Sequence, residues 1–319
     1  MEKSCSKKNP YISLVLPVYN EEKNLAPLFN RIVEELSKLN HSYEIIAVDD
    51  GSKDNSANVL RQIASGLNEL RVIEFKTNFG QTAALSAGIE LAMGDVIISM
   101  DSDLENDPSD IARLLDTLDE GYDVVSGWRQ NRWRHSFVTR KIPSIVANWL
   151  ISFLTGVRLH DYGCTLKAYR ADVIKGTKLY GEMHRFVPVY AAWQGGKVTE
   201  IAVKHEPRKY GKSNYGAGRI LRVLLDLVVV IFLHRYMNRP MHFFGAWGFW
   251  MLVLGVLGGI LLVTLRISGM SAPFESFPIL VALLILVGVQ LVLFGVVSEV
   301  LMRTYYESQN KHPYVIKKQ

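Results

Sequence analysis

The sequence lacks several features that would assign it to a familiar class at once. Only two of its 319 residues are cysteines, so no disulfide framework holds the fold, and both thiols are expected in a reducing compartment. No apolar stretch follows the lysine-rich N-terminus, so we expect no signal peptide. There is no internal repeat and no low-complexity linker. A chain of this length and average composition is expected to form about two structural units.

Charge is missing from two long stretches near the C-terminus. Residues 243–265 contain no charged residue, and residues 279–297 contain Gln290 as the one strongly polar interruption. Each run meets the length of about 20 residues needed to cross a bilayer. The sequence therefore predicts two transmembrane helices in residues 240–303, followed by a tail over residues 304–319.

The net charge of +5 does not indicate nucleic-acid binding, because the basic residues gather around the two apolar runs. The loop between the runs, residues 266–276, holds one Arg and one Glu. By the positive-inside rule, we expect a multi-pass inner or plasma membrane protein whose catalytic part and both termini are cytoplasmic. The flanking basic residues are Arg219, Arg222, Arg235, Arg239, Arg303, Lys311, Lys317 and Lys318.

Residues 1–215 alternate short apolar runs with helical patterns. This alternation predicts an α/β domain with a doubly wound, mostly parallel sheet. Expected strands are residues 12–16, 43–48, 70–75, 96–100 and 124–125, and expected helices are residues 21–39, 53–64, 81–92 and 110–118.

A third apolar stretch, residues 217–234, carries Arg219, Arg222 and Asp226 along one helical side. Its uninterrupted apolar part, residues 223–233, is too short to span a membrane. We expect residues 216–239 to form a juxtamembrane interfacial helix; an amphipathic helix packed on the catalytic domain is the alternative.

The segment GDVIISMDSDLENDP, residues 94–108, is the most informative part of the chain. An apolar strand ends there on Asp101 and Asp103, with Glu105 and Asp107 close behind. In open α/β sheets, ligands collect outside the carboxyl ends of the strands. Carboxylates crowded at that edge repel one another unless a cation lies among them, and hard oxygen ligands suit Mg²⁺ or Mn²⁺. The alternative is a solvated turn that caps the next helix.

Two further strand ends carry acidic residues. The first expected strand runs into Pro17-Val-Tyr-Asn-Glu21, and the second ends on Asp49-Asp-Gly51. Asp49 has the oxygens to accept hydrogen bonds from a base or ribose, and Gly51 permits a tight turn. Each segment alone is an ordinary strand-to-helix turn, but three of them at parallel strand ends would converge on one cleft.

In this order the motifs resemble glycosyltransferase family 2, which has the GT-A fold. The similarity is greatest to the membrane-anchored branch that transfers a sugar to polyprenyl phosphate, including dolichyl-phosphate mannose synthases and bacterial undecaprenyl-phosphate sugar transferases. The resemblance covers nearly the whole chain. It implies a nucleotide-sugar site at Pro17, Tyr19, Glu21, Asp49 and Asp101, and a Mg²⁺ or Mn²⁺ site at Asp101, Asp103 and Glu105, where Glu105 replaces the family's usual Gln.

The second half of the domain resembles the acceptor side of that family. Arg129 follows the fifth strand, and Arg140 to Ser144 match the R-x-x-x-S element that binds the lipid phosphate. Arginine suits phosphate oxygens, although a solvated basic face beside anionic lipid is the alternative. Residues 161–169 resemble D-x-x-S-G-F-R-A-Y, which implies a donor-sugar region at Asp161, Gly163, Cys164 and Thr165.

Residues 208–215 resemble R-x-x-G-x-S-K, a basic loop that closes over the diphosphate. Arg208 is the expected contact, acting with Asp101 and Asp103 in catalysis. Asn214 stands where the family has Lys, and whether it or Lys212 takes that place stays open. Gln130 to Trp133 do not fit the Q-x-x-R-W motif of processive synthases, because one residue between Gln and Arg is missing.

The resemblance implies inverting transfer of one sugar, expected to be a hexosyl group, to polyprenyl phosphate. A phosphate monoester has a second pKa of about 6 and needs little help from a general base. A lipid hydroxyl acceptor would need one, and the sequence shows no histidine clearly placed for it. The same fold also suits a nucleotidyltransferase or a membrane subunit that binds nucleotide without catalysis. The sequence determines neither the donor base nor the polyprenol length; glycines at 255, 258 and 259 would allow a homo-oligomer through the membrane helices.

Overall fold

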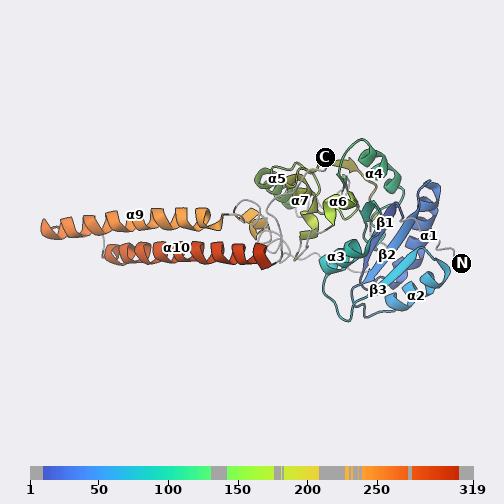
Figure 1. The fold of residues 1–319 in the computed structure, drawn as a ribbon, viewed down its shortest axis with the longest axis horizontal. Helices are drawn as coiled ribbons and strands as arrows, with labels where there is room; N and C mark the ends of the chain where they lie inside the picture. The colour runs from blue at the N-terminus through green and yellow to red at the C-terminus, as the bar shows by residue number, and fades with distance from the viewer. Residues whose placement is uncertain are drawn as a thin grey trace. The chain divides into compact units, whose positions relative to one another are not determined.

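The computed structural model describes residues 10–130, 142–175, 181, 183–207, 227–229, 231–232, 236, 239–271 and 275–308. It separates into two compact units, residues 1–227 and 228–319, of which the first holds the sheet and the second two long helices (Figure 1). Most of the juxtamembrane helix expected over residues 216–239 lies outside the described residues. The four-part division of the chain therefore stays a prediction.

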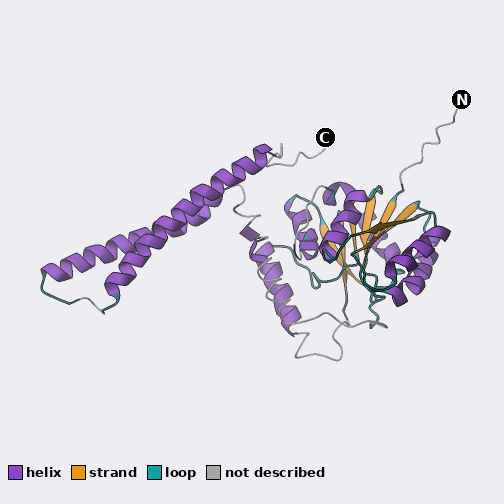
Figure 2. Cartoon of the chain, turned by 90° about the horizontal axis from the view of Figure 1, so that it is seen from below, coloured by secondary structure: helices purple, strands orange, loops and turns teal. Residues whose placement is uncertain are grey.

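A sheet forms the centre of the first unit (Figures 1 and 2). It has seven strands in the order β3-β2-β1-β4-β6-β5-β7. Strands β3, β2, β1 and β4 run parallel, whereas β6 is antiparallel to both β4 and β5. The expected mostly parallel sheet is thus confirmed, with one reversed strand in its middle. The strands are β1 Ile12–Val18, β2 Tyr43–Asp49, β3 Leu70–Glu74, β4 Val96–Ser99, β5 Val124–Trp128, β6 Lys167–Arg170 and β7 Val198–Ala202.

Helices cover both faces of the sheet because the buried strands carry apolar residues on both sides. Along β1, Leu14 and Leu16 join a core with helices α1, α2 and α4, while Val15 joins a second core with α3, α6 and α7. All three side chains are fully buried. The helices are α1 Glu22–Lys38, α2 Ser56–Gly66, α3 Gln81–Leu91, α4 Asp110–Asp119, α5 Ile142–Thr155, α6 Ala171–Ile174 and α7 Val187–Trp193, with a short 3-10 helix η2 Met183–Arg185.

One helix begins later than the sequence pattern predicts. Helix α2 starts at Ser56 rather than at Lys53. The reason is the Asp54 carboxylate, whose Oδ1 accepts hydrogen bonds from the Ser56 backbone N–H at 3.0 Å and from its hydroxyl at 2.6 Å. Such a local side-chain bond offers the backbone an alternative to the helix. The residues after the Asp49 turn therefore stay outside the helix.

The second unit consists of two long apolar helices, α9 Pro240–Ile267 and α10 Phe277–Ser308. Each contains a stretch of 28 residues that is long and apolar enough to cross a membrane. Glycines let the two helices pack closely: a Cβ on Gly248 would lie 2.8 Å from the Gly288 carbonyl oxygen, and one on Gly255 would lie 2.6 Å from the Ile285 side chain. The Gly258 position likewise faces Val281 of α10. Gly255 and Gly258 thus serve packing within one chain, and association between chains stays a prediction.

Candidate active site

The three acidic strand ends of the sequence lie at one edge of the sheet. Strands β2, β1 and β4 are neighbours and run parallel, so their carboxyl ends meet there. The Ser102 hydroxyl donates to the Pro17 carbonyl oxygen at 2.9 Å, and the Asp50 N–H donates to the Val18 carbonyl oxygen at 2.8 Å. These bonds join the residues that follow β4 and β2 to the last two residues of β1. The convergence that the sequence predicted is confirmed by the geometry.

Two of these loops contain residues in a sparsely populated backbone conformation. Among the described non-glycine residues, only Asn20 and Leu104 have positive φ, at 56° and 63°. Asn20 Oδ1 accepts from the Lys53 N–H at 2.8 Å, and the turn at Leu104 lets the Glu105 N–H donate to Asp103 Oδ1 at 3.0 Å. Such conformations are retained where the surrounding structure fixes them, commonly at functional sites.

Asp101 and Asp103 form a close pair of carboxylates at the end of β4. Burial raises the pKa of Asp101 to about 6, and repulsion from Asp103 adds to the rise. Asp101 Oδ1 accepts a hydrogen bond from Gln81 Nε2 at 2.6 Å, which fixes its orientation. Asp103 is 5% exposed. Within the described part of the chain, no three His, Cys, Asp or Glu side chains close around a common point at metal-binding distance.

The carboxylates of Asp49 and Asp50 hold the loops beside this pair. Asp49 is buried and accepts from the Ser52 N–H at 3.2 Å and from the Ser52 hydroxyl. Asp50 accepts from the Phe79 N–H at 2.7 Å and the Gly80 N–H at 2.9 Å, and burial raises its pKa. Asp50 was not predicted from the sequence to have a role, although the Asp-Asp doublet was the available signal. Donor binding by Asp49 stays a prediction.

Gly51 has the role that its place after the doublet predicts. Its φ is +66°, and a Cβ there would lie 2.5 Å from the Thr77 carbonyl carbon. The turn after β2 therefore packs directly against the backbone of the loop that precedes α3. No other residue fits this position without moving that loop.

Arg129, expected to bind the lipid phosphate, is joined to Asp161, expected in the donor-sugar region. Arg129 Nε lies 2.8 Å from Asp161 Oδ2, and its Nη2 lies 3.1 Å from Oδ1. The Arg129 side chain is 2% exposed and that of Asp161 is 12% exposed. Asp161 Oδ1 also accepts from the Gly163 N–H at 3.0 Å. This bidentate pair connects the end of β5 to the loop before β6, and both assigned roles stay predictions.

The remaining donor-sugar residues divide between the pocket and the core. Thr165 lines the pocket beside Asp101, and its carbonyl oxygen accepts from the Ser99 hydroxyl at 2.6 Å. Cys164 is fully buried in the first core, and burial raises the pKa of its thiol. Its small size serves packing against the sheet.

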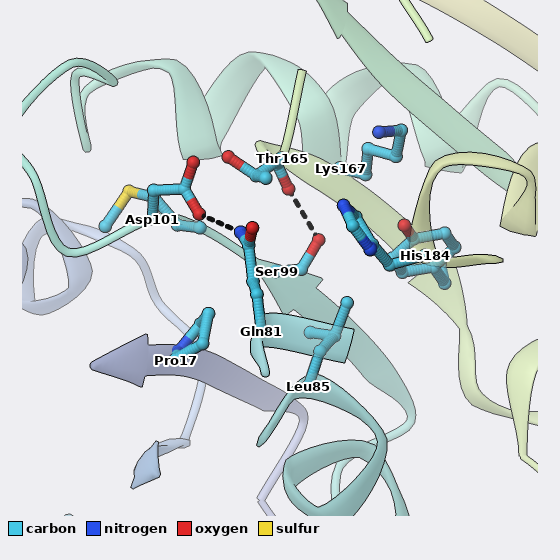
Figure 3. Close-up of a pocket in the computed structure, with 10 residues that line it drawn as sticks. Pro17, Gln81, Leu85, Ser99, Asp101, Thr165, Lys167 and His184 are labelled. Atoms are coloured by element: carbon cyan, nitrogen blue, oxygen red, sulfur yellow. Dashed lines mark hydrogen bonds between the residues drawn. The ribbon is translucent and has the colours of Figure 1, made fainter. Parts of the chain in front are cut away.

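A small polar pocket lies beside Asp101, on the α3 side of the sheet. Figure 3 shows Gln81 bonded to Asp101 and Ser99 bonded to the Thr165 carbonyl, with Lys167 and His184 on the other side. Three of its residues were not predicted from the sequence: Gln81, Lys167 and His184. For Lys167 the available signal was its place within the 161–169 motif. The complete lining is Pro17, Gln81, Leu85, Ser99, Met100, Asp101, Thr165, Lys167, Tyr169 and His184.

The other expected site residues either do not line this pocket or lie outside the described part of the chain. Tyr19 and Glu21 follow β1; Glu21 binds the Asn24 side chain, and its N–H donates to the Ser56 hydroxyl at 2.9 Å. Ser144 lies in the first turns of α5 and is half-buried. The predicted contacts Arg140 and Arg208, and the open pair Lys212 and Asn214, lie outside the described residues.

Comparison with known proteins agrees with this geometry. The profile described as "Glycosyl transferase family 2" matches residues 13–177. Dodecaprenyl-phosphate galacturonate synthase of Rhizobium johnstonii is 42% identical over 96% of this chain and 92% of its own length. Undecaprenyl-phosphate 4-deoxy-4-formamido-L-arabinose transferase of Proteus mirabilis is 36% identical over 96% and 93%. Glucosyl-3-phosphoglycerate synthase of Mycobacterium tuberculosis, in complex with Mn²⁺, UDP and phosphoglyceric acid, superposes with a TM-score of 0.53 at 19% identity, covering 70% of this chain and 78% of that one.

The sheet with its acidic strand ends has the GT-A fold, and two long apolar helices follow it in the chain. More specifically, the chain belongs to glycosyltransferase family 2. Full-length relatives are polyprenyl-phosphate sugar transferases, so the similarity noted in the sequence is confirmed.

Proposed function

We propose that this protein transfers one sugar from a nucleoside diphosphate sugar to polyprenyl phosphate at the cytoplasmic face of a membrane. Two observations together support the proposal. The acidic strand ends form one site on a glycosyltransferase sheet, and the relatives that match nearly the whole chain are named for transfer to undecaprenyl or dodecaprenyl phosphate. The sugar is a hexuronate in one relative's name and a formamido-pentose in the other's, so a simple hexose is not required.

Two parts of the chain suit an acceptor that resides in a membrane. Helices α9 and α10 are long enough to cross it, and we place the loop between them outside the cytoplasm. Helix α5 contains Ser144 of the predicted lipid-phosphate element and has an exposed apolar face. Its Trp149 and Phe153 rings stack with centroids 5.7 Å apart. Ile145, Val146, Trp149 and Phe153 are exposed by 54%, 55%, 64% and 71%. We propose that this face enters the headgroup region and brings the cleft to the height of the lipid phosphate.

A divalent cation fits the acidic pair. Two hard carboxylates, held close in a buried site with mutual repulsion, match the one or two carboxylates with which proteins bind Mg²⁺ or Mn²⁺ together with substrate phosphates. Asp101 and Asp103 would hold it, with Glu105 as the further predicted ligand. When bound, it would stabilise the charge that develops on the departing diphosphate.

The chain's own residues then position the reactants. Gln81 holds the Asp101 carboxylate in place, and Asp161 fixes the planar guanidinium of Arg129. We propose that Arg129, Arg140 and Ser144 orient the acceptor phosphate in line with the leaving group, while Arg208 contacts the donor diphosphate. The acceptor is largely dianionic at neutral pH, so positioning rather than proton removal accounts for the rate. Attack from the opposite face inverts the anomeric carbon.

A lipid hydroxyl acceptor would need a general base, and the sequence pattern shows no histidine clearly placed for that role. His184 brings this alternative back. The structure puts its ring in the pocket beside Asp101. However, Lys167 also lines that pocket, and a nearby cation disfavours the positively charged imidazolium that a general base forms. Transfer to polyprenyl phosphate therefore remains the better-supported reaction.

The test is a transfer assay with purified full-length protein in detergent. Undecaprenyl phosphate, Mn²⁺ and radiolabelled UDP- and GDP-linked sugars are supplied, and label in the organic phase is counted. Transfer that stops with EDTA and in the Asp103→Asn variant supports the proposal. Release of diphosphate instead of nucleoside diphosphate would identify a nucleotidyltransferase. Label that enters diacylglycerol but not undecaprenyl phosphate would identify the hydroxyl acceptor.

A further inference from the structure

The pocket beside Asp101 contains a buried cation that the proposed chemistry does not use. Lys167 is the first residue of β6 and is 2% exposed. Its neighbours across the sheet are Ser99 of β4 and Ser126 of β5. Residues directly opposite in antiparallel strands point to the same face, so the amine lies on the face that carries the pocket. The Ser126 hydroxyl is buried and has no hydrogen-bond partner among the described residues.

The Lys167 ammonium has no carboxylate partner in the described part of the chain. Its Nζ donates to the carbonyl oxygens of Tyr162, at 3.3 Å, and Cys164. An ammonium has three N–H groups, so two carbonyls do not complete its coordination. The nearby Asp161 carboxylate already accepts hydrogen bonds from Nε and Nη2 of Arg129. Burial lowers the pKa of Lys167 to about 8, as expected for a cation that lacks an adjacent counter-ion.

The opposite wall of the pocket has a fixed orientation. The Thr82 hydroxyl donates its one hydrogen to the Gly181 carbonyl oxygen at 2.5 Å. The 2.6 Å contact between Thr82 Oγ1 and His184 Nδ1 must therefore be donated by the ring. This assigns the hydrogen of a neutral His184 to Nδ1 and makes Nε2 the ring's hydrogen-bond acceptor. A neutral acceptor suits a sugar hydroxyl, whereas Lys167 suits an anion.

We propose that Lys167 binds a carboxylate on the donor sugar, so that the natural donor is a nucleoside diphosphate uronic acid. This inference rests on the proposed sugar transfer. Of the two sugar classes named above, it selects the hexuronate over the formamido-pentose. A neutral sugar brings only hydroxyl and amide groups to this pocket, which leave the buried ammonium without a counter-ion. A uronate carboxylate supplies that counter-ion beside Asp101, where the sugar of a donor bound at the acidic pair would lie.

The first experiment compares sugars that differ only at C6. Affinities of the full-length protein for UDP-galacturonate and UDP-galactose, and for UDP-glucuronate and UDP-glucose, are measured by calorimetry with Mn²⁺ and no acceptor. At least one uronate is expected to bind about 10- to 150-fold more tightly than its neutral partner, the range for one hydrogen bond to a charged group. Equal or weaker binding of both uronates overturns the inference. Because no acceptor is present, this result does not depend on the proposed transfer.

Variants identify the residue responsible. Lys167→Met is expected to reduce the preference for the uronate to about one, whereas Lys167→Arg retains most of it. His184→Asn keeps the hydrogen bond to Thr82 and is expected to weaken both donors equally, so the ratio does not change. If Lys167 served only to bind the two loop carbonyls, a different result would be expected: Lys167→Met would lower the melting temperature and leave the preference for the uronate intact. That outcome overturns the assignment even where Lys167→Met is less stable.

The transfer assay separates the two proposals. Uronate preference in binding, together with label from the uronate in undecaprenyl phosphate, supports both. Uronate preference without transfer to undecaprenyl phosphate contradicts the proposed acceptor and leaves the donor assignment standing. Efficient transfer from a neutral hexose, with no uronate preference, supports the proposed function and overturns the donor assignment.

Discussion

Replacing Asp101 with Asn is expected to abolish transfer and to stabilise the metal-free protein. The carboxyl of the folded protein keeps its proton up to a pKa of about 6, whereas that of the unfolded chain releases it near 3.8. Stability therefore falls as the pH rises from about 4 to about 6, and the full penalty is present above 6. Asn is neutral at every pH, and its Oδ1 still accepts the hydrogen bond from Gln81.

The size of the effect follows from the shift in pKa. A rise of about two units corresponds to an upper limit of about 3 kcal/mol at neutral pH. For a domain of this size, that free energy shifts the melting temperature by about 6–12 °C. We expect Asp101→Asn to melt several degrees above the wild type at pH 7.5 in EDTA and to lose this advantage at pH 4. Asp116→Asn, an exposed acid on α4, is the control for removal of a carboxylate.

Thermal unfolding in detergent across this pH range is the assay, repeated with Mn²⁺. The wild type is expected to gain stability from Mn²⁺, because the cation relieves the repulsion between Asp101 and Asp103, and Asp101→Asn is expected to gain much less. An Asp101→Asn protein that melts at or below the wild type at pH 7.5 in EDTA would refute the reasoning. The carboxylate pair would then be satisfied without a cation.

Three further outcomes are expected. Asp161→Ala removes the carboxylate that binds the buried Arg129 through two nitrogens and should reduce the free energy of unfolding by about 3–5 kcal/mol in denaturant titrations, whereas the double variant with Arg129→Met should recover part of that loss. Gly51→Ala should lose at least about 1–3 kcal/mol and bind donor more weakly by calorimetry, because a Cβ at φ +66° meets the backbone of Thr77. The Mn²⁺ concentration for half-maximal transfer should rise about tenfold per pH unit below pH 6, because Asp101 must release its proton to bind the cation.

The half of the site at the ends of β1, β2 and β4 could be predicted, because its residues directly follow those strands in the sequence. Each acidic segment follows a recognisable strand, and parallel strands bring their carboxyl ends to one edge without any knowledge of side-chain packing. The same logic does not distinguish the two members of an acidic doublet. Asp49 binds Ser52 in its own turn, whereas Asp50 binds Phe79 in the loop before α3. Only the folded turn shows which of the two carboxylates binds which loop.

The other half of the site was not predictable, because it depends on one reversed strand. Lys167 and His184 lie far along the chain from Asp101 and come beside it through β6, which runs antiparallel to β4. Four residues of β6 carry no pattern that specifies strand direction. The resemblance to the family pointed to the loop before β6 as the donor-sugar region. In the structure, Cys164 of that loop belongs to the core, and Thr165 lines the pocket.

The site collects features that are unfavourable by themselves. Two carboxylates repel each other, a buried ammonium lacks a carboxylate partner among the described residues, and Asn20 and Leu104 hold strained backbone conformations. The rest of the sheet tolerates them because its core side chains are almost completely buried on both faces. The acidic pair suits a cation, and the ammonium suits an anion. A metal-bound uronate nucleotide would bring both charges in the arrangement that this pocket presents, so it should stabilise the fold more than the metal or a neutral sugar nucleotide does.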